Sequence, residues 1–310
     1  MAASTQTTTT TTTTLPTPSS LHLTTPQPHN VHTTLHYLVP PPPNQAPPPT
    51  YVNRPETYAR PSDDVEVLIH DIRGHEDEFT LDKNGFQIHR HVSGEKEFLD
   101  GEETKGDWVG EYYGEVERLL MDVTGASKIV IFDHTIRRNP EDSRTKANSP
   151  EGPPLRGPVH RVHIDQTPQA SRNRVASHLP PEDVAKYLAG RHQIINVWRP
   201  IRTVMRDPLG IADARSVPDK DLVPVGLIYP NRKGETYGVL RGDDGAHKWY
   251  YKSYMSPEEV ILIKCYDSKD DGRAKRVPHT AFVDPGADNE GPGRESIEVR
   301  ALVLTPEDTE

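Results

Sequence analysis

Cysteine is almost absent from this sequence of 310 residues, in which Cys265 stands alone. A single cysteine excludes an intramolecular disulfide and any zinc site built on cysteine ligands. Long apolar runs are missing too, so the sequence predicts no membrane-spanning helix. The start of the chain has neither the basic region nor the apolar core of a secretory signal, and we therefore expect a cytoplasmic protein without a membrane partner.

Positive charge is also in short supply, because 36 lysines and arginines face 46 aspartates and glutamates, giving a formal net charge of −10. The basic residues form no continuous stripe of the kind that binds a phosphate backbone. A nucleic-acid partner is therefore not expected.

Apolar residues make up only 33% of the chain, and the shortage is concentrated near its start. Threonines run from Thr7 to Thr14, and several of the 31 prolines follow in residues 39–49. Such a segment cannot bury enough apolar surface to offset the entropy lost on ordering. We therefore expect a disordered Thr/Pro-rich tail at residues 1–60 and a single domain at residues 61–310.

The pattern of apolar residues predicts a mostly β domain with flanking helices. Between residues 112 and 123 apolar side chains recur at helical spacing, and Gly125 stands where a C-terminal cap belongs. A shorter helix at 180–190 begins with prolines and acids and ends in glycine. Short strands with turn residues between them favour an antiparallel sandwich or barrel. The expected strands cover residues 65–70, 86–91, 128–132, 193–198, 223–229, 236–240, 249–251, 260–265 and 296–304.

His163-Ile164-Asp165 is the first candidate site. Alternate side chains of a strand point to the same face, so His163 and Asp165 lie side by side while Ile164 faces the other layer. An imidazole and a carboxylate in this arrangement supply two of the three ligands of a 2-His-1-carboxylate iron site. The motif is short and common, so it needs a second histidine from elsewhere in the chain.

His279 is the candidate for that third ligand, and an arginine pattern follows it. If strand alternation extends back from the last expected strand to residue 294, then Arg294, Ser296 and Arg300 share one face. A guanidinium and a hydroxyl two residues apart suit a carboxylate ligand. Arg300 lies roughly 20 Å further along at about 3.3 Å per residue, so only one of the two arginines can hold an acid that also reaches the metal. We favour Arg294, and the choice between it and Arg300 stays open.

Several longer pieces of the sequence resemble the fungal hydroxylase/desaturase family of secondary metabolism, which includes a gibberellin desaturase and is similar to a component of cephalosporin 7-methoxylation. The resemblance runs over roughly residues 65–304 and excludes the tail. The matching pieces are Val-His-Ile-Asp-Gln-Thr-Pro (162–168), Gln-Ile-Ile-Asn-Val-Trp-Arg-Pro (193–200), Gly-Glu-Thr-Tyr (234–237), Leu-Ile-Lys-Cys-Tyr-Asp-Ser (262–268), Pro-His-Thr-Ala-Phe (278–282) and Arg-Glu-Ser-Ile-Glu-Val-Arg-Ala-Leu-Val (294–303).

The resemblance implies a double-stranded β-helix (jelly-roll) oxygenase that depends on iron(II), 2-oxoglutarate and O2. Carried over by position, His163, Asp165 and His279 would be the iron ligands. Arg294 and Ser296 would bind the distal carboxylate of 2-oxoglutarate. The implied activity is oxidation of an unactivated C–H bond of a small molecule, by hydroxylation, desaturation or oxidative cyclisation, with release of succinate and CO2.

Other residues near these motifs could complete the pocket. Asn196 is a candidate for contact with the C1 side of 2-oxoglutarate. A carboxylic acid or an amino acid as substrate would favour nearby arginines. The candidate substrate-binding residues are Arg137, Arg172, Trp198 and Arg199.

Two functions of other classes remain open from the sequence. A jelly-roll binding protein without oxygenase chemistry would keep the fold but form no succinate. A cupin-type metal hydrolase or isomerase would have a further histidine near the first pair and would not need the arginine. The sequence does not define the substrate or the oligomeric state.

Overall fold

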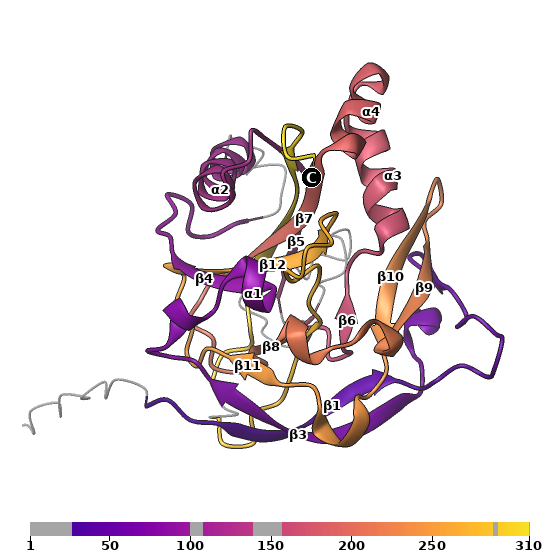
Figure 1. The fold of residues 1–310 in the computed structure, drawn as a ribbon. Helices are drawn as coiled ribbons and strands as arrows, with labels where there is room; N and C mark the ends of the chain where they lie inside the picture. The colour runs from indigo at the N-terminus through magenta and orange to yellow at the C-terminus, as the bar shows by residue number, and fades with distance from the viewer. Residues whose placement is uncertain (1–26, 100–107, 139–156, 288–290, 310) are drawn as a thin grey trace, which may run out of the picture.

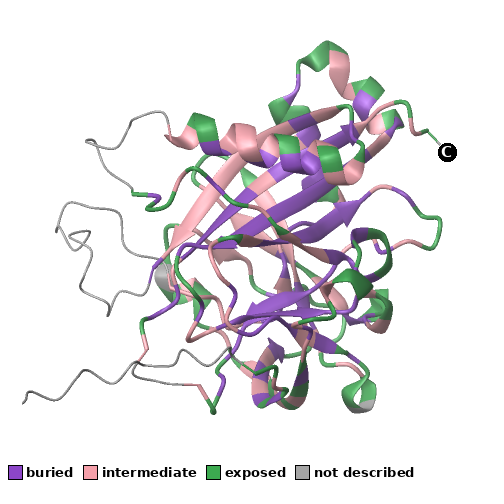
Figure 2. Ribbon diagram, turned by 90° about the vertical axis from the view of Figure 1, so that its left-hand side faces the viewer, coloured by how far each residue is buried: buried purple, intermediate pink, exposed green. Residues whose placement is uncertain are grey.

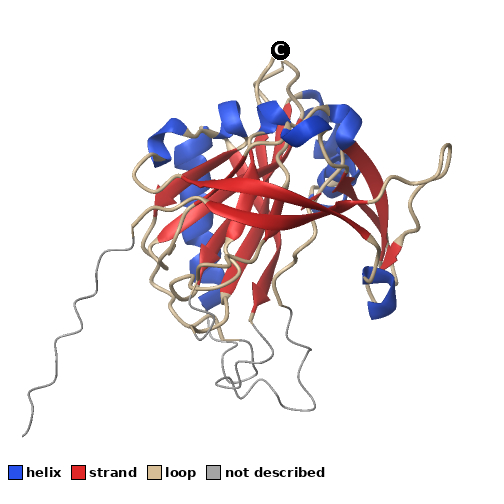
Figure 3. Ribbon diagram, turned by 90° about the horizontal axis from the view of Figure 1, so that it is seen from below, coloured by secondary structure: helices blue, strands red, loops and turns tan. Residues whose placement is uncertain are grey.

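The computed structural model describes residues 27–99, 108–138, 157–287 and 291–309. Strands dominate this part of the chain, with a few helices at the periphery (Figure 3). Residues 1–26 of the expected tail lie outside the described residues. The two sheets face each other as a sandwich, which confirms the predicted jelly-roll core (Figure 1).

The larger sheet has nine strands and carries the His-x-Asp motif near its centre. Its short strand β6 lies between β13 and β10, so residues from distant parts of the sequence meet there. In spatial order the strands are β1 (Val31–Leu38), β3 (Ser62–Asp71), β11 (Trp249–Tyr251), β8 (Leu209–Ala212), β13 (His279–Ala281), β6 (His163–Ile164), β10 (Lys233–Val239), β9 (Leu222–Ile228) and β2 (Thr50–Tyr51).

The smaller sheet has five antiparallel strands with two buried faces (Figure 2). One face packs on the larger sheet, where Ile194, Trp198 and Leu302 join residues of both sheets in one core. On the other face Val197 and Val299 belong to a second core. In spatial order the strands are β4 (Phe86–Arg90), β12 (Glu259–Asp267), β7 (Arg191–Pro200), β14 (Ser296–Thr305) and β5 (Lys128–Arg137).

Helix α2 (Trp108–Thr124) covers the outer face of the smaller sheet (Figure 1). Its apolar side chains, among them Tyr112 and Val116, face that sheet, as their helical spacing predicts. Gly125 follows with a positive φ of 66°, the backbone conformation of a C-terminal cap. The predicted helix at 180–190 is α4 (Pro181–Ala189). The other α-helices are α1 (Leu81–Asn84) and α3 (Pro168–His178), and 3₁₀ helices lie at Pro55–Tyr58, Glu76–Glu78, Ala214–Ser216, Asp219–Asp221 and Asp243–Gly245.

The prediction of disorder up to residue 60 is wrong for residues 31–38. These residues form β1, which pairs with β3 along its whole length. Val31 and Leu35 are buried in the core between the sheets. The side chain of Tyr37 is buried too, and its hydroxyl accepts a hydrogen bond of 2.8 Å from Trp249 Nε1. Alternation of inward and outward residues in this strand decides the structure, although the surrounding composition is typical of disorder.

None of the helices in the described ranges is long and apolar enough to cross a membrane.

Candidate active site

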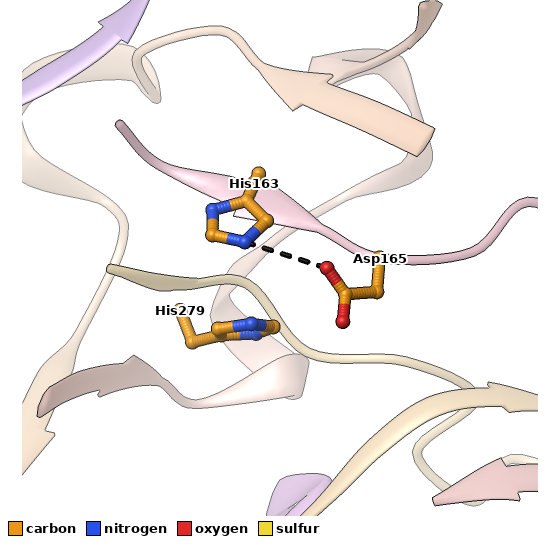
Figure 4. A group of neighbouring side chains, drawn as sticks. All are labelled: His163, Asp165 and His279. Atoms are coloured by element: carbon orange, nitrogen blue, oxygen red, sulfur yellow. Dashed lines mark ion pairs between the residues drawn. The ribbon is translucent and has the colours of Figure 1, made fainter. Parts of the chain in front are cut away.

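His163, Asp165 and His279 come together in the larger sheet (Figure 4). His163 in β6 and His279 in β13 are direct partners across two antiparallel strands, and their ring centroids are 4.5 Å apart. Asp165 follows β6 by one residue, and its Oδ1 lies 3.5 Å from His163 Nε2. One ligand atom from each of the three residues lies within 4.8 Å of the others, which is compact enough to hold one metal ion. The spacing predicted by strand alternation is therefore present.

The hydrogen bond of His163 orients its ring toward the site. His163 Nδ1 lies 2.7 Å from the carbonyl oxygen of Arg161. Because a carbonyl can only accept a hydrogen bond, Nδ1 carries the proton in the neutral ring. The lone pair is then on Nε2, the nitrogen that faces Asp165, and Nε2 is available as a metal ligand.

His279 is buried, and its Nδ1 has no hydrogen-bond partner among the described residues. Burial, and next the nearby His163, lower the pKa of His279 to about 3. The ring is therefore neutral near pH 7, the state in which an imidazole binds a metal.

Asp165 stays ionised in spite of its surroundings. Burial raises its pKa, but the Arg300 guanidinium and His163 outweigh burial and hold the pKa well below the usual range. Two neutral imidazoles and one carboxylate, without a thiolate, form the ligand set that suits iron(II). The residues present therefore fit the metal that the family resemblance implies.

Arg294 is a buried cation that lines the same pocket as His163 and His279. Its Nη1 donates to the carbonyl oxygen of Asp207 over 2.7 Å, and its Nε has no partner among the described residues. No carboxylate in that part of the chain lies within ion-pair distance of Arg294. Burial, and next the charge of Arg137, lower its pKa to about 10, so it remains charged near pH 7. A buried guanidinium without a counter-ion fits an anionic ligand.

Of the other predicted site residues, Arg137 and Trp198 line the pocket, whereas Ser296 is absent from its lining. Ser296 is buried and lies opposite Arg137 of β5 in the register of the smaller sheet. Arg137 and Trp198 both line the pocket with the two histidines, and the Trp198 ring lies 5.6 Å from the Arg294 guanidinium carbon. The structure thus brings Arg137 and Trp198 to the site.

Arg199 is not near the pocket, contrary to the prediction. Strand β7 directs Arg199 to the face opposite Trp198, under helix α2. There its Nε donates to Tyr112 Oη over 3.0 Å, and its Nη1 donates to the carbonyl oxygens of His91 and Pro257. Arg199 therefore fastens the helix and a loop to the sheet.

Arg172 also lies away from the pocket. Its side chain is exposed on α3, where its charge lowers the pKa of His192 after the larger effect of burial. The predicted substrate contact of Arg172 is not supported, because the residue is absent from the pocket lining.

Asn196 is not itself a pocket-lining residue, but it contacts Asp165 and the lining residue Glu298. Its Nδ2 donates to Asp165 Oδ2 over 2.8 Å and to Glu298 Oε1 over 2.5 Å. Arg300 also bonds Asp165 Oδ2, through Nε at 3.0 Å. Sequence reasoning missed this contact between Asp165 and the last strand, although strand alternation places Glu298 and Arg300 on the inward face.

Comparisons with known proteins give one consistent result. A family model described as an oxidoreductase/YMDC permease-like domain matches residues 35–304. The hydroxylase/desaturase efuI of Hormonema carpetanum is 39% identical over 254 residues, which cover 77% of this chain and 83% of that protein. The alpha-ketoglutarate-dependent dioxygenase phiK of a fungal species is 37% identical over 254 residues, covering 80% and 87%.

A solved structure agrees with these relatives. The iron and alpha-ketoglutarate-dependent endoperoxidase NvfI is similar to this chain with a TM-score of 0.76 and 27% sequence identity. The similarity covers 89% of this chain and 97% of the NvfI chain. The fold is therefore shared over most of this chain.

Proposed function

Because this chain belongs to the fungal hydroxylase/desaturase family of Fe(II)/2-oxoglutarate-dependent dioxygenases, we propose that it oxidises an unactivated C–H bond of a small molecule in fungal secondary metabolism. His163, Asp165 and His279 are the proposed iron ligands. Arg294 is the proposed holder of the distal carboxylate of 2-oxoglutarate, and Ser296, two residues further along the chain, is the proposed second donor.

One observation carries this assignment: the two histidines of a compact His-Asp-His group line one pocket together with a buried arginine that has no carboxylate partner among the described residues. A 2-oxoglutarate molecule bound to the metal needs a cation for its far carboxylate. Arg294 is placed for that role, whereas Arg300 is fully engaged with Asp165, Glu298 and Asp133. The arrangement supports Arg294 over Arg300.

Iron(II) and 2-oxoglutarate, when bound, supply the activation of O2 that no amino-acid side chain can perform, with succinate and CO2 as by-products. The residues of the chain supply position and shielding. The Arg294 guanidinium binds and orients the cosubstrate, and the side chain of Trp198, which is 2% exposed, forms a wall of the pocket. Excluding water there protects the reacting groups from side reactions.

The substrate class follows from the charge of the pocket. Arg137 and Arg294 line it together with one acid, Glu298. Because the arginines outnumber the acid, a carboxylic acid or an amino acid is the substrate that we propose. The proposed oxidation covers hydroxylation, desaturation and cyclisation. We also propose a cytoplasmic location.

The two other functional classes are less well supported by the site. A cupin-type hydrolase would add a histidine, but the group found among the described residues contains two histidines and one aspartate. A binding protein without chemistry would not need two histidines beside an ionised carboxylate.

The test is anaerobic reconstitution of the purified full-length protein with Fe(II) and then 2-oxoglutarate. We expect the weak visible charge-transfer band of the iron–2-oxoglutarate complex. Asp165→Ala should abolish the band and succinate formation while the protein stays folded. His178→Ala, an exposed residue of α3, is the control and should keep both. A folded, iron-loaded wild type without a band would contradict the proposal.

A further inference from the structure

The two carboxylate oxygens of Asp165 have different surroundings. Asn196 Nδ2 and Arg300 Nε donate to the same oxygen, Oδ2, over 2.8 and 3.0 Å. The other oxygen, Oδ1, is the one that lies 3.5 Å from His163 Nε2. One oxygen is thus bonded to the smaller sheet, and the other faces the histidines of the larger sheet.

Arg300 cannot turn easily, because each of its three guanidinium nitrogens has a partner. Nε binds Asp165, and Nη2 lies 3.0 Å from Glu298 Oε1. Nη1 donates to Asp133 Oδ1 over 3.1 Å and to Thr135 Oγ1 over 2.9 Å. The side chains of Arg300, Asp165 and Glu298 are 13%, 17% and 9% exposed, so the pairs of Arg300 with these two acids are largely shielded from solvent and fix the plane of the fork.

Asn196 is held in the same way. It lies directly opposite Arg300 in the register of β7 and β14. Its Nδ2 also donates to Glu298 Oε1, the oxygen that pairs with Arg300. The contacts therefore close into a ring that runs from Asp165 through Asn196, Glu298 and Arg300 back to Asp165. We call these four residues the Asp165 clamp.

We propose that Arg300 and Asn196 are positioning residues that keep Asp165 a metal ligand through one oxygen only. This inference rests on the proposed role of Asp165 in binding iron. Three ligand atoms leave half of an octahedral coordination sphere free, enough for 2-oxoglutarate, which takes two positions, and for O2. A carboxylate that bound through both oxygens would take one of those positions. Because Oδ2 already accepts two hydrogen bonds from the smaller sheet, only Oδ1 is available.

The experiment measures Mn(II) binding to the metal-free full-length protein, from the electron paramagnetic resonance signal of unbound Mn(II). Arg300→Gln and Asn196→Ala should each weaken binding by about 10–100-fold, the usual effect of losing a partner of a metal ligand. Arg300→Lys keeps the charge but loses the fork, so its loss should be smaller. If Arg300→Gln does not fold, Asn196→Ala decides the question.

A second readout reports geometry directly. Deuterium electron spin echo modulation in D2O counts the water molecules on bound Mn(II). Loss of either hydrogen bond frees one lone pair of Asp165 Oδ2 for the metal, so Mn(II) bound to Asn196→Ala or Arg300→Gln should carry one water fewer than in the wild type. A role in folding alone would not change this count.

Arg191→Gln is the matched control. Arg191 lies in β7, its side chain is 12% exposed, and it also pairs with two acids, Asp267 at 2.7 Å and Asp82 at 3.2 Å. This variant should lower thermal stability and leave Mn(II) affinity unchanged.

The outcomes separate the clamp from the metal site itself. A wild type that does not bind Mn(II) would refute the proposed metal site. A wild type that binds, with Arg300→Gln and Asn196→Ala binding equally tightly and with the same water count, would overturn only the clamp. Equal loss of affinity in Arg191→Gln would also overturn it.

Discussion

His163 and His279 are direct partners in adjacent strands, although 115 residues of the chain lie between them. Their ring centroids are 4.5 Å apart in a buried pocket, and His279 Nδ1 has no partner among the described residues. We propose that the two histidines are ligands of one metal ion, and substitution of either one tests that role.

Replacing His279 by leucine should separate stability from metal binding. An unpartnered buried polar group costs about 1–3 kcal/mol, so His279→Leu should leave the metal-free protein as stable as the wild type or more stable. The stabilisation that a divalent metal gives the wild type should disappear. Thermal unfolding with and without Mn(II) measures both effects. A metal-dependent rise in the melting temperature of His279→Leu equal to that of the wild type would exclude His279 as a ligand.

Arg294 and Arg300 should respond differently to substitution. Loss of a charge-assisted hydrogen bond costs about 1.5–3 kcal/mol, so Arg294→Gln should raise the KM for 2-oxoglutarate by about 10–100-fold. The affinity of Arg294→Gln for Mn(II) in the absence of 2-oxoglutarate should not change, because Arg294 donates to the Asp207 carbonyl oxygen and not to a proposed metal ligand. Steady-state succinate release and Mn(II) titration test these two statements. If only Arg300 variants raise the KM for 2-oxoglutarate, the roles of the two arginines are exchanged.

The N-terminal boundary of the folded unit should lie before β1. Deleting residues 1–60 removes β1 and with it the buried side chains of Val31, Leu35 and Tyr37. Each large apolar side chain contributes about 1.5–3 kcal/mol on burial, so this deletion should yield an unfolded or aggregated protein. Deleting residues 1–26 leaves β1 intact and should preserve the melting temperature. Circular dichroism of the two truncated proteins decides between this boundary and the one expected from composition.

Most of the site could be predicted because strand alternation is a local rule. That rule predicted His163 beside Asp165. It also predicted that Arg294, two residues before β14, lies on the same face as Ser296. The same rule puts Trp198 and Arg199 on opposite faces, and the prediction that both line the pocket was wrong because it treated neighbours in sequence as neighbours in space.

The Asp165 clamp and β1 could not be read from the sequence with the same ease. The partners of Asp165 come from β7 and β14, and their contacts depend on how the two sheets face each other, which no local pattern encodes. β1 carries the alternating apolar residues of a strand, but its neighbours are rich in threonine and proline, and composition outweighed periodicity.

Asp213 should account for part of the acid sensitivity of the fold. It is buried and directly follows β8. Its Oδ2 accepts a hydrogen bond of 3.0 Å from Asn84 Nδ2, and its Oδ1 accepts one of 3.0 Å from the backbone amide of Arg215. Burial raises its pKa, but hydrogen bonds from Arg215 and Asn84 outweigh burial and hold the pKa below its ordinary value. A carboxylate with a lowered folded-state pKa stabilises the protein above the unfolded-state value of about 3.9, and this contribution is lost as the pH falls through the folded-state pKa.

Asp213→Asn should therefore reduce the free energy of unfolding at pH 7 by about 1–3 kcal/mol, since charge-assisted hydrogen bonds are weakened. Below pH 4 the difference from the wild type should shrink, because the wild type loses the same interactions by protonation. Urea unfolding at pH 7 and at low pH measures both values. Asp122→Asn, on the exposed side of α2, is the control and should follow the wild type at each pH. A constant difference between Asp213→Asn and the wild type down to the lowest pH would show that Asp213 stabilises the fold by its shape and not by its charge.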